Sequence, residues 1–257
     1  MTVTEGSGAQ FDFGRVTSRT AGLIQRNFVP FSVLSLIFSG APIFLFMLLG
    51  PVFIDSDVLA GGVSGPLVSI VSFLTGLVLQ GALMRASIDD LSGKSVSIGA
   101  SLNAALGVLF PLLGLGIVVG VGIIAGMILL IVPGIILAVR WSVAAPVVVA
   151  ERVGIFDAMG RSAKLTENNR WAIFGLMVLY AIVVWVVSIV VMLAIPGAVI
   201  GFGGGASGAA LISFAVVMAL LQALQSLIGT VGIAAIYFEL RQIKEGVGVT
   251  EIAAVFD

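Results

Sequence analysis

Long apolar runs, separated by short polar segments, make up most of the chain. Crossing about 30 Å of hydrocarbon takes about 20 apolar residues in a helix. Most of the runs reach that length, so the pattern predicts an all-α polytopic membrane protein with six transmembrane helices. The predicted spans lie at about 28–49, 66–85, 104–131, 134–150, 171–196 and 207–237.

The third and fourth spans come from one apolar stretch, residues 104–150, which is too long for one crossing. Pro133-Gly134 is the natural break, because proline ends a helix and glycine permits a tight reversal. The glycines at 120, 122 and 126 offer an earlier turn. The position of this turn stays open.

The basic residues predict how the chain is threaded. The segments 50–65 and 197–206 contain no Lys or Arg, and of the 12 basic residues all except Arg140 fall on the opposite side. By the positive-inside rule that side is cytoplasmic, with both termini inside. The chain therefore divides into a cytoplasmic tail (1–27), a six-helix membrane domain (28–240) and a second tail (241–257).

The composition agrees with a polytopic membrane protein and excludes several kinds of catalytic and metal site. The chain is 60% hydrophobic and 10% charged, against about 45–50% and about 25% in ordinary soluble domains. It has no Cys and no His, which excludes disulfides, thiolate catalysis and the commonest general base and metal ligand. No nucleotide motif occurs, since Gly203-Gly204-Gly205 lacks the Lys-Ser/Thr ending of a phosphate loop. We expect no cofactor, no metal and no nucleic acid partner.

Two segments outside the spans have helical amphipathic patterns. Arg15, Arg19 and Arg26 share one face of a helix before the first span, and Arg161 and Lys164 do so after the fourth. Both segments are interpreted as interfacial helices whose basic faces orient the protein at the membrane surface. The alternative is specific binding of anionic lipid headgroups.

Arg140 is predicted at membrane depth, where a charge is costly and marks a functional site by default. A polar face of the last span offers it acceptors, and we predict that Arg140 points toward that face. The reading leaves open a tie between helices, a site for cargo or a lipid headgroup, or simple snorkelling to the surface. The candidate intramembrane polar site is Arg140, Gln80, Gln222, Gln225 and Ser226.

A second candidate set follows the fourth span. Glu151 ends that span, and Arg161 and the Leu165-Thr166 turn follow it. We expect them to form a cytoplasmic collar in which a nearby Arg holds Glu151. The predicted collar is Glu151, Arg161, Ser162, Leu165 and Thr166.

Residues 133 to about 174 also carry a family resemblance. The motif residues are Pro133-Gly134, Arg140-Trp141, Pro146, Glu151, Ala158, Arg161-Ser162, Leu165-Thr166, Asn168 and Arg170-Trp171. This succession resembles the membrane domain family named after glycerophosphoryl diester phosphodiesterases, which implies a six-helix bacterial membrane domain near lipid metabolism. Some members carry a soluble phosphodiesterase barrel whose activity depends on His. This chain has no His, so the resemblance does not imply that activity.

Three functions therefore compete. The favoured one is a non-catalytic scaffold or regulatory module connected with lipid or envelope homeostasis, whose partners are membrane lipids and either a membrane protein or a second copy. The alternative is a transporter or lipid translocator with a site near Arg140 and the polar face of the sixth span. An intramembrane enzyme is the least favoured, because no acid lies within any predicted span.

Overall fold

The computed structural model describes residues 11–55, 64–194 and 208–246. Gly203-Gly204-Gly205 and parts of both predicted tails lie outside these residues. Every element within them is a helix. In chain order the helices are α1 (Phe13–Arg26), α2 (Phe28–Ser35), the π-helical η1 (Leu36–Gly40), α3 (Ala41–Asp55), α4 (Ser64–Leu91), α5 (Ile98–Gly107), α6 (Leu109–Leu129), α7 (Ile131–Arg140), α8 (Ala144–Glu151), α9 (Ile155–Leu165), α10 (Arg170–Ala194) and α12 (Gly208–Glu245).

Six helical segments are long and apolar enough to cross a membrane, which confirms the predicted fold class. They are Phe28–Leu48, Ser69–Leu91, Leu109–Leu129, Ile131–Glu151, Arg170–Leu193 and Ile212–Glu245. The first runs through α2, η1 and α3, and the fourth through α7 and α8. Both amphipathic segments are helical as predicted, as α1 and α9.

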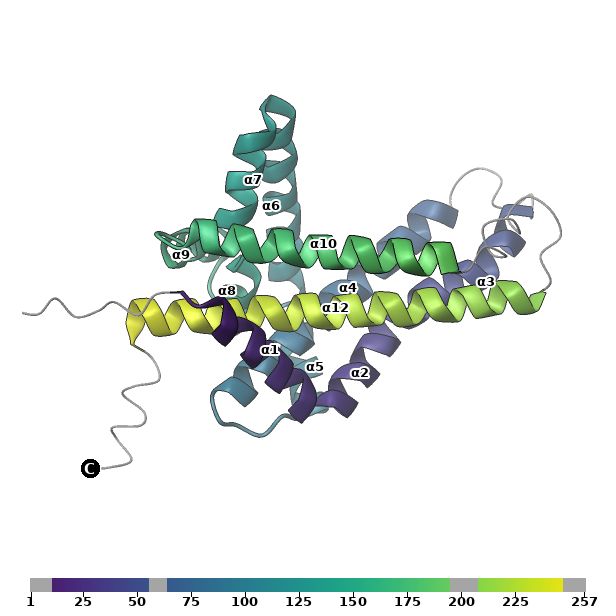
Figure 1. The fold of residues 1–257 in the computed structure, drawn as a ribbon, viewed down its shortest axis with the longest axis horizontal. Helices are drawn as coiled ribbons and strands as arrows, with labels where there is room; N and C mark the ends of the chain where they lie inside the picture. The colour runs from purple at the N-terminus through teal and green to yellow at the C-terminus, as the bar shows by residue number, and fades with distance from the viewer. Residues whose placement is uncertain (1–10, 56–63, 195–207, 247–257) are drawn as a thin grey trace, which may run out of the picture.

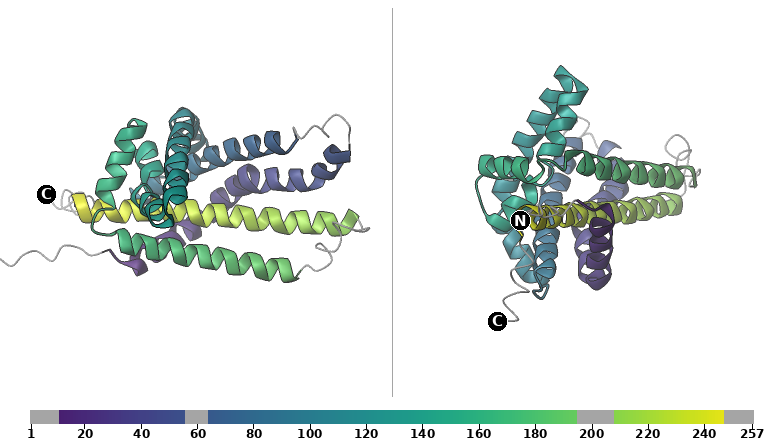
Figure 2. Two further views of the ribbon diagram at one scale, coloured as in Figure 1. Left: turned by 90° about the horizontal axis from the view of Figure 1, so that it is seen from above. Right: turned by 60° about the vertical axis from the view of Figure 1, so that its left-hand side comes forward.

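The long helices α10 and α12 lie side by side and set the length of the molecule, and α3 and α4 run roughly with them (Figures 1 and 2). The start of α1 lies against the last turns of α12, because Arg15 contacts Glu239. Both described ends of the chain therefore meet at one end of the bundle. An even number of crossings would produce this arrangement, and the side of the membrane on which the two ends lie stays a prediction.

The helices α6 and α7 form a hairpin that stands across α10 and α12 (Figure 1). The chain reverses at Leu130, whose backbone is extended. This position lies between the two places that the sequence left open, the glycines at 120, 122 and 126 and Pro133-Gly134. Pro133 instead lies in the first turn of α7, where its missing N–H costs no hydrogen bond. Gly134 allows the two helices to touch, since a Cβ on it would lie 2.8 Å from the Met127 nitrogen.

The predicted span 134–150 is not one continuous helix. It ends as α7 at Arg140, turns through residues 141–143 and resumes as α8. The break places Arg140 at a helix end and not in the middle of a helix. This difference changes the environment of the charge, as described below.

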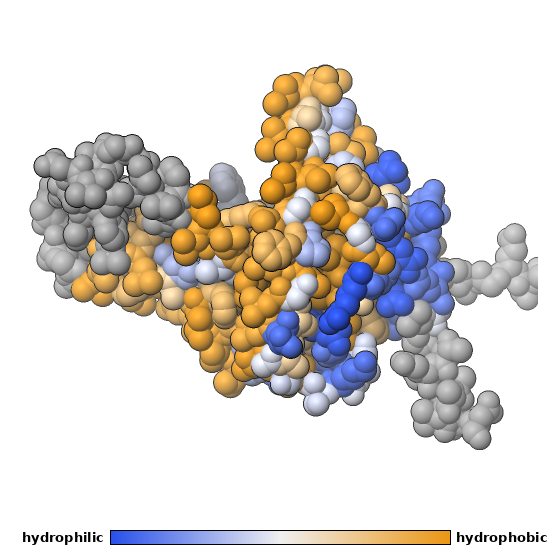
Figure 3. Space-filling view, turned by 180° about the vertical axis from the view of Figure 1, so that it is seen from behind, coloured by the Kyte–Doolittle hydropathy of each residue, from blue (hydrophilic) through white to orange (hydrophobic). Residues whose placement is uncertain are grey.

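Side chains sort the molecule into a polar end and an apolar body. Figure 3 shows hydrophilic residues gathered at the end that holds the last turns of α12, with mainly hydrophobic residues over the rest of that face. Most of α10 is apolar and exposed, and Ile173 is its one buried residue among those whose side chains are described. A helix that is apolar on its exposed faces is suited to hydrocarbon and not to water. The polar end is thus the part of the bundle that meets water or headgroups.

Candidate functional site at the polar end of the bundle

The polar end is held together by ion pairs between helices that are far apart in the sequence. The helix α1 begins at Asp12, whose carboxylate accepts from the Gly14 N–H at 2.7 Å and so caps it. Val16 and Leu23 are buried beneath α1, which fixes its apolar side against the bundle. Arg15 and Arg19 of the same helix then reach Glu239 of α12.

Glu239 on α12 is the most buried charge at this end, with 2% of its side chain exposed. The Arg15 Nε donates to its Oε1 at 2.8 Å, and the Arg19 guanidinium pairs with its Oε2. Arg19 also donates to the Gln242 side chain at 2.5 Å and stacks 5.3 Å from the centre of the Phe238 ring. A buried carboxylate requires paired, hydrogen-bonded partners, and two arginines supply them here.

The end of α1 is tied to α4 in the same way. Arg26 donates to the Asp90 carboxylate at 2.5 Å, and the Asn27 side chain donates to its other oxygen at 2.9 Å. The hydrogen bond with Asp90 raises the pKa of the Arg26 guanidinium. The three arginines predicted to face the membrane surface are therefore engaged within the protein.

The predicted collar residues Glu151 and Arg161 come together between α8 and α9. The Arg161 Nε lies 3.2 Å from the Glu151 Oε2, and its NH2 group pairs with Glu245 of α12. Tyr237 of α12 donates to the Glu151 Oε1 at 2.9 Å. Burial lowers the pKa of Arg161, but the hydrogen bond to Glu245 and the attraction of Glu151 outweigh it, so that the pKa is raised.

The other collar residues hold the backbone of α7. The Ser162 hydroxyl donates to the Arg140 carbonyl oxygen at 2.9 Å, and the Thr166 hydroxyl contacts the same oxygen at 3.4 Å. Leu165 is buried in the core beside them. These contacts satisfy the carbonyl that the end of α7 leaves open. The collar thus joins α7, α8, α9 and α12, and its functional role stays a prediction.

The Arg140 side chain does not make the contacts predicted for it. It is exposed and forms no hydrogen bond or ion pair with the described part of the chain. The reason is the break after α7, which puts Arg140 beside the amphipathic helix α9 and away from the middle of α12. The guanidinium therefore forms no buried tie with the helices that the structure describes, and its role stays a prediction.

The polar residues of α12 pair with other helices instead. Ser226 hydrogen-bonds Ser39 of the π-helical turn at 2.7 Å, and the Gln225 amide donates to Ser188 of α10 at 3.2 Å. The Tyr180 hydroxyl donates to the backbone carbonyl oxygen of Gln225 at 2.7 Å. Gln222 is exposed, and no contact joins it or Gln80 to these groups among the described residues. The predicted intramembrane site is therefore not assembled as one cluster.

Glu239 and its pairing with two arginines were not identified from the sequence. Two features of the sequence could have indicated the pairing. An acid follows the last apolar run, and two arginines spaced by four residues lie on one face of the helix before the first apolar run. Pairing between the chain's two ends depends on tertiary packing, which these features do not specify. No group of three or more metal-ligating side chains occurs among the described residues.

Comparisons with known proteins agree with this picture. The model of the family described as the membrane domain of glycerophosphoryl diester phosphodiesterase matches residues 117–246. A UPF0259 membrane protein of Pectobacterium carotovorum subsp. carotovorum (strain PC1) is 34% identical over 134 residues, which are 52% of this chain and 49% of that protein. The match thus spans about half the length of the curated relative. No solved structure matches the chain.

Proposed function

Because the chain belongs to the family of the membrane domain of glycerophosphoryl diester phosphodiesterase, we propose that it is a non-catalytic module of the bacterial inner membrane. In this role it acts as a scaffold or regulator connected with lipid or envelope homeostasis. Both termini face the cytoplasm, at the polar end of the bundle. Its partners are membrane lipids and another membrane protein or a second copy of the chain.

One observation carries the proposal: four carboxylates at the polar end are engaged by arginines from other helices. A general acid or base must reach a substrate proton, and a nucleophile must face a reacting atom. Here the carboxylates instead face guanidinium groups of the protein itself. This arrangement favours a role in holding helices together over a role in catalysis. These four carboxylates are Asp90, Glu151, Glu239 and Glu245, and Asp89 pairs with Arg85 of its own helix.

The alternative, a transporter or lipid translocator, needs Arg140 to act with the polar face of α12. The structure separates these groups, since Ser226 and Gln225 pair with Ser39 and Ser188. A pathway lined by these side chains would first have to break those pairs. The module is therefore the better supported function.

The test is reconstitution of the purified protein in liposomes. One set of vesicles carries a fluorescent phospholipid in one leaflet, and another encloses glycerophosphodiesters. The proposal predicts neither accelerated lipid exchange between leaflets nor hydrolysis, relative to protein-free vesicles. Protein-dependent exchange would establish the translocator, and protein-dependent hydrolysis would establish an enzyme. Native mass spectrometry of the gently extracted protein should meanwhile show a bound membrane protein or second copy.

A further inference from the structure

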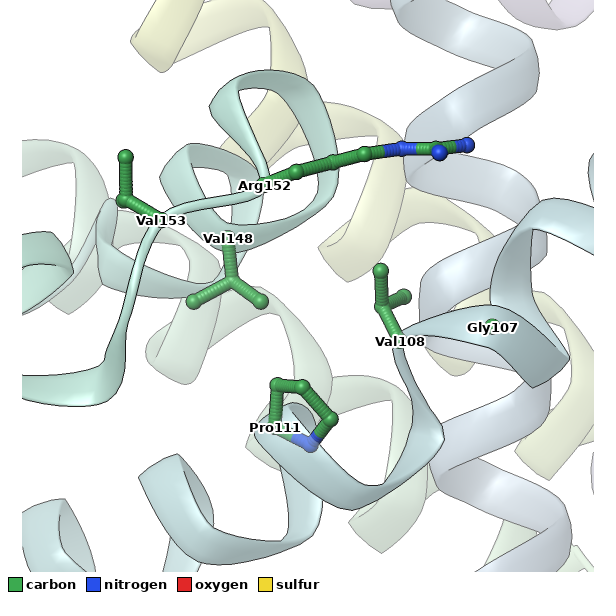
Figure 4. Close-up of a pocket in the computed structure, with 6 residues that line it drawn as sticks. All are labelled: Gly107, Val108, Pro111, Val148, Arg152 and Val153. Atoms are coloured by element: carbon green, nitrogen blue, oxygen red, sulfur yellow. The ribbon is translucent and has the colours of Figure 1, made fainter.

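A pocket opens between the α5–α6 junction and the corner that joins α8 to α9. Its volume is about 150 Å³. Its lining consists of apolar or backbone-presenting residues and one cation: Gly107, Val108, Pro111, Val148, Val153 and Arg152. Figure 4 shows the side chains of Val108, Pro111 and Val148 converging on a common space, over which Arg152 extends.

Arg152 differs from the arginines that tie helices together at the polar end, and it differs from the unpaired Arg140 because it lines the pocket. Arg15, Arg19, Arg26 and Arg161 are paired with carboxylates, whereas Arg152 is exposed and forms no hydrogen bond or ion pair with the described part of the chain. The guanidinium therefore keeps all its donors for a ligand. A planar guanidinium binds phosphate oxygens through paired hydrogen bonds, which makes phosphate the best-fitting anion.

The backbone at Arg152 is also unusual. Its φ is 51°, in the left-handed region that disfavours side chains with a Cβ, at a helix-ending position where glycine is commonest. An arginine at such a position carries strain that a glycine would avoid. This conformation is the one in which the Arg152 side chain extends over the pocket (Figure 4).

The surroundings extend the apolar wall beyond the pocket. Leu106 and Phe110 flank Gly107 and Val108 in sequence, and they are 57% and 79% exposed. Phe156, after the other wall of the pocket, is 75% exposed. A ligand with one phosphate and a long hydrocarbon chain could place the chain in the pocket and along these side chains. A free phosphate would use only the guanidinium.

We propose that this pocket binds an anionic phospholipid, with the phosphate on Arg152 and an acyl chain against Val108, Pro111 and Val148. The site lies at the polar end, level with the headgroups of the predicted cytoplasmic leaflet. The inference rests on the proposed membrane-module function and gives it a lipid class. The lipid site is tested by measuring lipid retention, whereas the proposed function is tested by measuring lipid exchange and hydrolysis. Either proposal can therefore fail while the other stands.

Three probes separate the sources of the ligand chemistry. The full-length protein is stripped of lipid in mild detergent, and native mass spectrometry measures binding of phosphatidylglycerol, of diacylglycerol with the same chains, and of glycerol 3-phosphate. The proposal predicts that phosphatidylglycerol is retained and that the other two are retained at least about tenfold less. Equal retention of glycerol 3-phosphate would show a soluble-phosphate site, and equal retention of diacylglycerol an apolar groove; either result overturns the proposal.

Matched variants test the residues. R152Q removes the charge but keeps a similar side chain, and it should reduce phosphatidylglycerol retention about tenfold or more, since charge-assisted hydrogen bonds are lost. K94Q removes an exposed cation away from the pocket and should retain the lipid. Unchanged retention by R152Q, or equal loss in the two variants, overturns the site.

A second variant keeps the test independent of the arginine. A Cβ on Gly107 would meet no atom within 4 Å, so G107L places a side chain at the pocket wall without a clash at that carbon. It should lower lipid retention while the lipid-free melting temperature stays unchanged. Retention of phosphatidylglycerol by folded G107L at the level of the unmodified protein would overturn the use of the pocket by an acyl chain.

Discussion

Arg19 of α1 and Glu239 of α12 form an ion pair between residues 220 positions apart in the chain. The carboxylate is almost completely buried, and Arg15 completes its coordination. This pair anchors the first described helix to the last one. Its environment explains why so few charges suffice to organise a bundle that is otherwise apolar, because each buried charge strongly disfavours arrangements that leave it unpaired.

The first prediction concerns this anchor. E239Q keeps the shape of the side chain but removes its charge, leaving two arginines without their counterion. We expect a loss of about 1–3 kcal/mol in unfolding free energy, because a partner of a buried charged hydrogen bond has been removed. Thermal melts in detergent should show a lower transition. E167Q, at an exposed acid without a described ion pair, is the control and should melt like the unmodified protein.

The second prediction compares the melting temperatures of a collar variant and a surface variant. E151A removes the acceptor of both Arg161 and Tyr237, whereas K94A removes an exposed charge. Because isolated surface charges contribute about 0–1 kcal/mol, only E151A should lower the melting temperature clearly. Equal shifts in the two variants would show that the collar does not stabilise the bundle.

The hairpin α6–α7 predicts a steric effect of a single methyl group. In G134A the new Cβ would lie 2.3 Å from the Met127 Cγ and 2.8 Å from its backbone nitrogen, so the helices must separate. Limited proteolysis or hydrogen exchange should show a loosened hairpin. G120A adds a methyl where nothing lies within 4 Å and should leave exchange unchanged. Equal protection in both variants would contradict the close contact of the two helices.

Six crossings predict where the tip of the hairpin α6–α7 lies. The segments Leu109–Leu129 and Ile131–Glu151 are each 21 residues long, which is about 31 Å of helix and enough to cross the hydrocarbon. Leu130 should therefore lie at the outer surface. A cysteine introduced at Leu130, in a chain without native Cys, should react with impermeant thiol reagents from outside the cell. Protection from both sides would place the hairpin tip within the membrane and would contradict six crossings.

The fold class could be predicted from sequence because apolar runs of membrane-spanning length are a strong local signal. The turn at Leu130 could not, because Pro133 is equally compatible with the end of one helix and the first turn of the next. Glu151 and Arg161 were predicted as partners because they lie close along the chain. The pairing of Arg19 with Glu239 depends on the packing of distant helices, and no local pattern specifies it.

Arg152 also could not be identified as a candidate ligand-binding residue from the sequence alone. In the sequence it is one more basic residue beside the fourth span, indistinguishable from Arg161. Its left-handed backbone, its lack of a carboxylate partner and its place over a pocket exist only in three dimensions. Candidate ligand sites of this kind are visible only after the structure shows which charges are already engaged.

We propose that the carboxylates paired with arginines from other helices support the bundle and perform no chemistry. The most direct test measures two properties of E151Q, E239Q and E245Q together: the melting temperature of the purified protein, and the ability to restore a strain that lacks it. The account predicts that restoration falls only as stability and membrane abundance fall. A variant that is as stable and abundant as the unmodified protein, yet restores nothing, would contradict the account, because that carboxylate would then act in a reaction.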